Sequence, residues 1–269
     1  MLNTYAYNRK TKEEDDAILA AVKRHHDAVA AKGHLVVFTA LIGSQNYDLD
    51  DEYSDIDTVS FIFPPLGSLA AAEEPQAFCI EMNDGHAEVK DIRVALNLLK
   101  KASPNSVEYF VSKYKYYNLL FAPELKEYLD DNTKMWNMVH CNYRHMLYAM
   151  SGMARQLTKR NMPAGKKYAH ALRLMDMHYH FFNSYNAGAV IELRMGGDRD
   201  LALAAKRDTD EEKTLIYEEE CEQIAGWLEN YRLGFEITDE QLKIEEFGQA
   251  LINSFQWKLF RKYIMETNR

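Results

Sequence analysis

The sequence predicts an α/β domain followed by an all-α domain. Between Leu35 and Lys90 the chain has short apolar, β-branched runs bounded by Pro, Gly, Asn and Asp, a pattern typical of strands. After Asp131 these runs largely disappear, and long stretches place apolar residues at helical intervals. We therefore expect a first domain over residues 1–130 and a helical domain over 131–269. The two should pack tightly, because no Gly/Ser-rich linker separates them.

Local patterns place the elements of the first domain. Residues 13–31 keep apolar side chains at helical spacing up to Gly33, which predicts a helix. Two β-branched runs then enclose a polar, acidic loop, and Pro64-Pro65 stops the second run. The turn Asn83-Asp84-Gly85 joins two further runs as a hairpin. We expect strands at 35–43, 56–63, 77–82 and 86–90, and a second helix at 92–101. In the second domain we expect helices at 136–159, 166–183, 210–231 and 241–267.

Composition excludes several classes of protein. With 269 residues, 12% aromatics, 12 Gly and 6 Pro, the chain is neither disordered nor collagen-like. Its three cysteines are far apart and lack CxxC spacing, so we expect them to be reduced, buried and structural. The N-terminal residues lack a signal-peptide pattern, and the apolar run at 35–42 is too short to cross a bilayer. A cytoplasmic protein without a membrane partner is expected.

Charge is segregated along the chain. The net charge of −9 disfavours binding of long nucleic acid by the molecule as a whole. Residues 132–175, however, contain eight Lys or Arg and no Asp or Glu, which leaves −17 on the remainder, since −9 minus +8 is −17. This basic block should face either an anionic ligand or the acidic first domain, and charge alone does not decide between them. Its members are Lys134, Arg144, Arg155, Lys159, Arg160, Lys166, Lys167 and Arg173.

Two short motifs carry candidate chemistry. Asp55 and Asp57 stand at the start of the second strand, where residues i and i+2 point to the same face. Two carboxylates side by side suit Mg²⁺, which prefers carboxylate oxygens and completes its shell with water and substrate phosphates. Gly43-Ser44, directly after the first strand, suits phosphate binding, because glycine lets backbone N–H groups approach closely and serine adds a hydroxyl.

These motifs resemble those of the nucleotidyltransferase superfamily typified by DNA polymerase β, whose pattern is hG[G/S] followed by Dh[D/E]h. GSQNYDLDDEYSDID is similar to the GSxxYG…SDxD stretch of a bacterial and phage branch. EVKDIR at 88–93 and SPNSVE at 103–108 match its later motifs. The resemblance implies a mixed sheet backed by helices. It also implies transfer of a nucleoside monophosphate from an NTP, with ATP favoured, to a hydroxyl acceptor with release of pyrophosphate. It covers residues 34–117 and extends to 166–174.

The resemblance also assigns roles to residues. Asp55, Asp57 and a third carboxylate would hold two Mg²⁺ ions, with Mn²⁺ as the alternative metal. The third carboxylate is Glu88 or Asp91; we favour Glu88 as metal ligand and general base, because Asp91 suits the first turn of the following helix. Gly43 and Ser44 would hold the β,γ-phosphates. Two positions depart from the branch, since Asp48 stands where glycine is usual and Gln45 where arginine is frequent.

In the basic block, Lys166, Lys167, His170 and Arg173 lie on one predicted helix, and the resemblance favours them as nucleotide-binding residues over a surface that pairs with the first domain. Arg173 and His178 also fit the R-x₄-H spacing of HEPN-type ribonucleases, a weaker alternative. The aromatic segment 109–117 is expected in the core rather than stacked on a base. A non-catalytic nucleotide-binding or regulatory protein is the other function considered. The acceptor (protein, RNA end, small molecule or second nucleotide) and the oligomeric state are left open.

Overall fold

A five-stranded mixed sheet forms the centre of the first part of the chain. The computed structural model describes residues 10–51, 54–183, 193 and 195–267. In the sheet the strand order is β3-β4-β2-β1-β5, with β2 and β4 parallel and the other pairs antiparallel. The predicted mixed sheet is thus confirmed. Its strands are β1 (Leu35–Ile42), β2 (Asp57–Phe63), β3 (Ala77–Met82), β4 (Gly85–Asp91) and β5 (Lys115–Tyr117).

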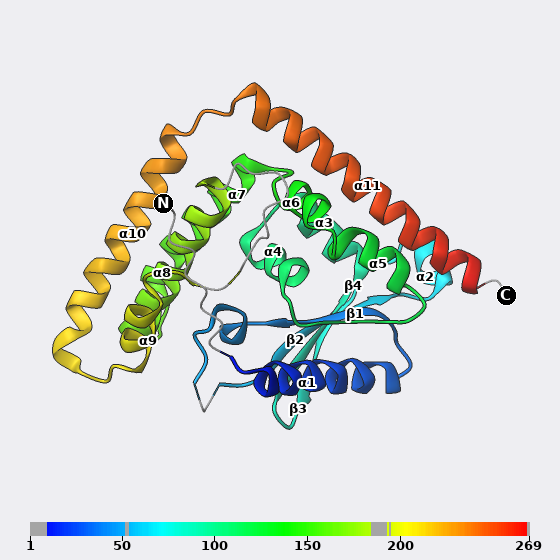
Figure 1. The fold of residues 1–269 in the computed structure, drawn as a ribbon, viewed down its shortest axis with the longest axis horizontal. Coiled ribbons are helices and arrows are strands. Elements are labelled where there is room, and N and C mark those ends of the chain that lie inside the picture. The colour runs from blue at the N-terminus through cyan, green and yellow to red at the C-terminus, as the bar shows by residue number, and fades with distance from the viewer. Residues whose placement is uncertain (1–9, 52–53, 184–192, 194, 268–269) are drawn as a thin grey trace.

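Helices cover both faces of this sheet (Figure 1). Helix α1 (Lys12–Ala31) begins at a capping box, in which Thr11 and Glu14 exchange hydrogen bonds, and packs on one face. The short helices α3 (Ile92–Lys100) and α4 (Pro104–Val111) pack on the other face. Successive side chains of β2 point to opposite faces of the sheet, which explains the two layers. Val59 and Phe61 join the large core on the α3/α4 side, whereas Thr58 forms a hydrogen bond with His25 of α1.

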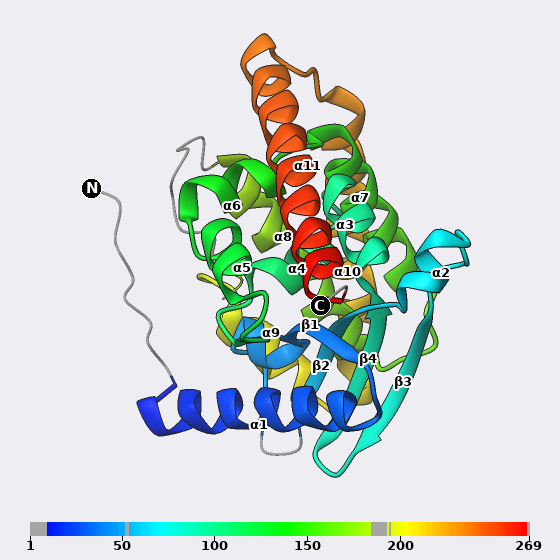
Figure 2. The same cartoon turned by 90° about the vertical axis from the view of Figure 1, so that its right-hand side faces the viewer.

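The described residues after β5 form mostly helices. Together with α2 (Leu66–Ala70), these are α5 (Ala122–Leu129), α6 (Asn132–Val139), α7 (Tyr143–Lys159), α8 (Ala164–Asn183), α9 (Arg199–Arg207), α10 (Thr214–Gly234) and α11 (Asp239–Thr267). Helix α10 packs along α7 and α8, and α9 packs on α8. Helix α11 returns to α3 and α5 of the first domain and also packs along α6 (Figure 2). Tyr263 near its end stacks on Phe63 and donates a 2.7 Å hydrogen bond to the Pro64 carbonyl.

One cluster of buried side chains extends across the expected domain boundary. It contains Phe61 of β2, Phe110 of α4, Met146 of α7 and Phe255 of α11. The boundary at 130/131 falls between α5 and α6, within this continuous core. No helix among the described residues is both long and apolar enough to cross a membrane.

Several expected elements differ in the structure. The stretch 136–159 forms two helices, because Asn142 caps a new helix by accepting a hydrogen bond from the His145 N–H. The three-residue strand β5 and helix α9 were not expected. Cys141 and Cys221 are buried as predicted, but Cys79 lies exposed on the edge strand β3. The aromatic segment does belong to the core, with Tyr109, Phe110 and Tyr114 buried.

Candidate active site

A cavity of about 430 Å³ lies between the loop that joins β1 to β2 and the helices α8 and α9. One wall carries carboxylates of the first domain, and the other carries cations of the helical region. The cavity brings together all the predicted site residues except Glu88 and Lys167. Its lining residues are Gly43, Ser44, Tyr47, Leu49, Asp51, Ser54, Asp55, Asp57, Lys166, Ala169, His170, Arg173 and Lys206.

Asp55 and Asp57 line the acidic wall at the mouth of β2. Asp57 is the first residue of the strand, and Asp55 precedes it and is exposed. The Nδ1 atom of His86 lies 2.6 Å from Asp57 Oδ1. That oxygen is nevertheless buried without a well-directed hydrogen bond in the structure. A buried carboxylate oxygen left in this state is suited to a cation as partner.

The β3–β4 turn fixes the backbone between these two carboxylates. The Ile56 N–H donates a 2.7 Å hydrogen bond to the Asp84 carbonyl. Gly85 has φ +151°, and a Cβ at this position would lie 2.2 Å from the Ile56 carbonyl oxygen. Asp84 is itself held by His25 of α1, whose Nε2 lies 2.9 Å from Asp84 Oδ1. The turn therefore approaches Ile56 as closely as glycine allows.

The two candidates for the third carboxylate have different surroundings. Glu88 pairs with Val59 in the parallel register of β4 and β2, so it shares the sheet face of Asp57. Its Oε2 atom lies 2.5 Å from Lys90 Nζ. Asp91 is buried at the N-cap of α3, where it accepts hydrogen bonds from the backbone and guanidinium of Arg93. Asp91 thus stabilises a helix start and an ion pair, while Glu88 remains the candidate third ligand.

The glycine of the Gly43-Ser44 motif has a different hydrogen-bond partner from the one expected. Gly43 has φ +87° and opens a 3₁₀ turn over Ser44–Tyr47. Its N–H donates a 2.6 Å hydrogen bond to Oε1 of Glu108 on α4. The Gly43 N–H is therefore directed to protein, and Ser44 is the member of this motif whose donors can serve a phosphate.

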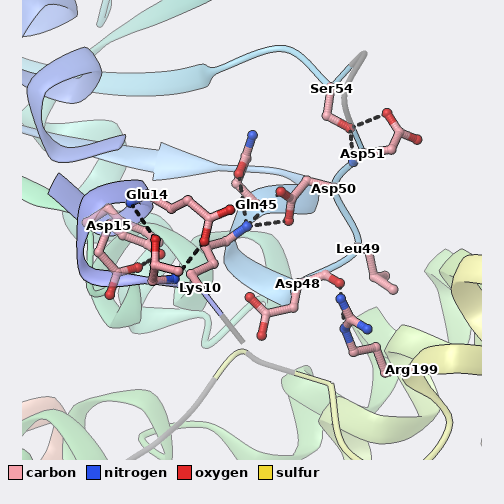
Figure 3. A network of polar contacts seen from close by, with 12 residues as sticks. Lys10, Glu14, Asp15, Gln45, Asp48, Leu49, Asp50, Asp51, Ser54 and Arg199 are labelled. Carbon is pink, nitrogen blue, oxygen red and sulfur yellow. Dashed lines mark hydrogen bonds and ion pairs between the residues drawn. The ribbon is translucent and has the colours of Figure 1, made fainter. Parts of the chain in front are cut away.

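Cations hold the rest of the loop in place (Figure 3). Lys10 Nζ lies 2.6 Å from Asp50 and 3.3 Å from Gln45 Oε1. Arg199 of α9 donates a 2.8 Å hydrogen bond to the Asp48 carbonyl. Asp48 has φ +55°, the left-handed conformation for which glycine is usual and which Asp tolerates. The chain therefore keeps a tight turn here, although Asp48 stands where glycine is usual.

The basic wall consists of one face of α8 together with Lys206 of α9. Lys166, His170 and Arg173 are spaced i, i+4 and i+7, which places them on one side of the helix. Burial, together with the positive charges of Arg173 and Lys166, lowers the pKa of His170 to about 3. His170 is therefore neutral at physiological pH, so the positive charge of this wall belongs to Lys166, Arg173 and Lys206.

Lys167, one residue along the helix, is not brought to the cavity. It is buried, and its Nζ lies 3.3 Å from Glu218 Oε1 of α10. A step of one residue rotates the side chain by about 100°, which accounts for the difference from Lys166. The positive charges of the basic block are thus divided: some line the cavity, and others pair with acidic side chains of other helices.

The HEPN-like spacing does not form a joint site. Arg173 faces the cavity, with its guanidinium carbon 4.4 Å from the Tyr47 ring centroid. His178 is buried among aromatic rings, 4.8 Å from Phe182 and 4.3 Å from Tyr231 between centroids. The two side chains therefore lie in different surroundings.

Several residues at the cavity were not among the sequence candidates, and three of them have side chains that take part in its contacts. Tyr47 and Lys206 line it, and Glu108 holds the loop behind it. Lys206 donates a 2.7 Å hydrogen bond to the Leu49 carbonyl and lies 3.5 Å from Asp51 Oδ2. A signal for Lys206 existed, because Asp198 followed by an Ala/Leu-rich segment is a helix start.

Metal binding at this site depends on which side chains can act as ligands. Among residues that the structure describes, no three His, Cys, Asp or Glu side chains form a group able to hold a metal by themselves. Mg²⁺, however, is usually bound by one or two carboxylates together with substrate phosphates and water. Asp55 and Asp57, beside a cavity that is open to a phosphate ligand, fit that second arrangement.

Comparison with known proteins identified a family and several similar solved structures. The model of the RlaP family, described as the RNA repair pathway DNA polymerase beta family, matches residues 12–181. The match covers more than half of the 269 residues and includes both walls of the cavity except Lys206. A nucleotidyltransferase-like protein from Exiguobacterium sibiricum is 13% identical over 91% of each chain, with a TM-score of 0.29. No curated protein matches the chain.

Proposed function

The chain belongs to the RNA repair pathway DNA polymerase beta family, a family of nucleotidyltransferases, and from this premise we propose that it transfers a nucleoside monophosphate from an NTP to a hydroxyl acceptor. In this reaction the acceptor oxygen bonds to the α-phosphorus, the bond from that phosphorus to the β-phosphate oxygen breaks, and pyrophosphate leaves. ATP is the favoured donor. The observation that carries the proposal is the cavity itself, where Asp55 and Asp57 face Lys166 and Arg173.

The charges of the two walls complement a metal–triphosphate ligand. Lys166, Arg173 and Lys206 would neutralise phosphate oxygens on the basic side of the cavity. Ser44 would add its hydroxyl and N–H to the β,γ-phosphates. Neutral His170 offers a hydrogen bond without further charge. The separation of an acidic wall from a basic wall supports a ligand that has phosphates at one end and a bound cation at the other.

Asp55 and Asp57 would hold Mg²⁺, or Mn²⁺ as the alternative, and Glu88 would be the third ligand. When bound, the metal supplies charge neutralisation and alignment of the acceptor oxygen with the α-phosphorus. The chain's own contribution is to present Asp57 and Glu88 on one sheet face, with Asp55 directly before β2 and the β3–β4 turn fixing Ile56 between the two aspartates. The Glu88 carboxylate would receive the proton of the acceptor hydroxyl as the new bond forms.

RNA is the acceptor that the family's description favours among the candidates, since it names an RNA repair pathway. The net charge of −9 opposes broad contact with a long polyanion, so we propose that a terminal hydroxyl of RNA, rather than an extended stretch, enters the cavity.

The proposal is tested by incubating the protein with Mg²⁺, each of four α-labelled NTPs, and either total RNA or RNA-depleted lysate. We expect label from ATP to enter RNA, and to disappear with Asp55→Asn or Asp57→Asn while the melting temperature stays close to wild type. Asp27→Asn, which changes an exposed carboxylate on α1, is the matched control and should retain activity. Binding of Mg²⁺–NTP with no labelled product would instead identify a nucleotide-binding regulatory protein.

A further inference from the structure

A buried carboxylate supports the Gly43–Tyr47 loop from the side of α4. The Glu108 side chain belongs to a residue that is 5% exposed. Its Oε1 atom accepts two hydrogen bonds, one of 2.6 Å from the Gly43 N–H and one of 3.1 Å from the Asn46 amide. The Tyr47 side chain also hydrogen-bonds the carboxyl group. One side chain therefore contacts the beginning, the middle and the end of the loop.

The same carboxylate faces the basic wall of the cavity. Arg173 lies over the Tyr47 ring and attracts the Glu108 charge. Burial raises the pKa of Glu108, while Arg173, the Asn46 amide and the Gly43 N–H oppose this rise. Glu108 thus contacts the loop from behind, and its charge is influenced by Arg173 of the opposite wall.

We propose that Glu108 is a positioning residue, which holds the Gly43–Tyr47 loop through its hydrogen bonds in the conformation that receives the phosphates of the NTP. This inference rests on the proposed function. Gly43 has φ +87°, and glycine has many alternative conformations, so an acceptor that fixes its N–H restricts the loop strongly. Without this acceptor, Ser44 would no longer be held at the cavity.

The chain offers a control in a second, partly buried carboxylate that accepts a backbone hydrogen bond. Glu245 on α11 also accepts a 2.6 Å hydrogen bond from a backbone N–H, that of Tyr143. Burial raises its pKa as well. Glu245 is not among the residues that line the active-site cavity. A purely structural role for Glu108 predicts that both carboxylates behave alike when substituted.

Two conservative variants separate position from charge. Glu108→Asp keeps the charge but withdraws the oxygens by one methylene group. We expect it to raise KM for the NTP by about 10- to 100-fold, the range for a lost hydrogen bond to a charged group. The value of kcat should change little, because ground-state and transition-state phosphate binding are weakened together. Glu108→Gln keeps an acceptor oxygen in place without the charge, and should recover KM to within about threefold of wild type. Glu245→Asp should lower thermal stability and leave KM unchanged.

Amide hydrogen exchange over residues 43–47 provides a readout that does not depend on activity. Exchange should be faster in Glu108→Asp than in wild type, Glu108→Gln or Glu245→Asp. The proposal is overturned if Glu108→Asp keeps wild-type KM and exchange, if Glu245→Asp raises KM equally, or if Glu108→Gln is as impaired as Glu108→Asp. A wild-type protein without NTP binding or transfer would refute the proposed function instead, and the exchange data would still report on the Glu108 contact.

Discussion

Lys167 Nζ lies 3.3 Å from the Glu218 carboxylate of α10, whereas its neighbour Lys166 lines the active-site cavity. Two adjacent lysines of the basic block therefore have different environments. The pair allows the same substitution to test phosphate binding and helix packing separately, with each variant serving as the control for the other.

Lys166→Ala should weaken binding of Mg²⁺–NTP by about 10- to 100-fold, because it removes a cation from the basic wall. The melting temperature should stay near that of wild type, since Lys166 is exposed. Lys167→Ala should leave the affinity unchanged and lower stability by ~1 kcal/mol, about 2–4 °C, because it removes the ion pair with Glu218. The loss stays small because Glu218 is partly exposed and its carboxylate remains hydrated. Calorimetric titration and thermal unfolding check both values. The reverse pattern would remove Lys166 from the site.

Glu88→Gln should lower kcat by ~10²–10⁴-fold, since it removes the proposed general base and third metal ligand. Asp91→Asn should preserve kcat and lower stability by about 1–3 kcal/mol, because the buried cap of α3 loses its charge beside Arg93. Steady-state rates and denaturant unfolding of the two variants provide the comparison. If Asp91→Asn is the inactive variant and Glu88→Gln is active, Asp91 is the third carboxylate.

Gly85→Ala should impair activity by displacing Ile56, the residue between Asp55 and Asp57. The added Cβ would lie 2.2 Å from the Ile56 carbonyl, and a misplacement of about 1 Å can cost ~10²-fold in rate. Overpacking should also cost about 1–3 kcal/mol of stability. Gly67→Ala on α2 is the control, because a Cβ there meets no atom within 4 Å. Equal activity of both variants would show that the turn does not determine carboxylate position.

His178→Phe should reduce the loss of stability in acid. Burial lowers the pKa of His178 to about 4. In the unfolded chain this imidazole is protonated below about pH 6.5, whereas in the folded chain it stays neutral down to about pH 4. Unfolding therefore becomes easier as pH falls through this window, by up to about 1.4 kcal/mol per pH unit for one group. Urea unfolding at pH 7.5 and 5.0 measures the difference. His170 contributes in the same direction, so part of the dependence should persist.

At pH 7.5 the same variant should be at least as stable as wild type. The Nδ1 atom of His178 is buried without a hydrogen-bond partner in the structure, and phenylalanine removes this unsatisfied group from an aromatic cluster. If the variant and wild type lose the same stability between pH 7.5 and pH 5.0, His178 does not titrate in this window.

Much of the fold was predictable because it depends on local periodicity. The two strands that flank the acidic loop, the hairpin and the helix at 92–101 agree with β1 to β4 and α3 within one or two residues. Strand alternation also predicted that Asp55 and Asp57 share a face; both line the cavity, although Asp55 precedes β2 and does not belong to the strand. Strand β5 was missed because three residues carry too little pattern to be distinguished from a loop.

The sequence by itself determined the fold class, the family and the carboxylate pair at the start of β2, because these follow from residue order over short distances. The tertiary structure decided which cations face those carboxylates. Lys206 arrives from an unexpected helix, Lys167 turns to Glu218, and the Gly43 N–H is taken by Glu108, 65 residues away. Such contacts are set by how helices pack and rotate against one another, and the pattern of a single segment carries no information about its distant partner.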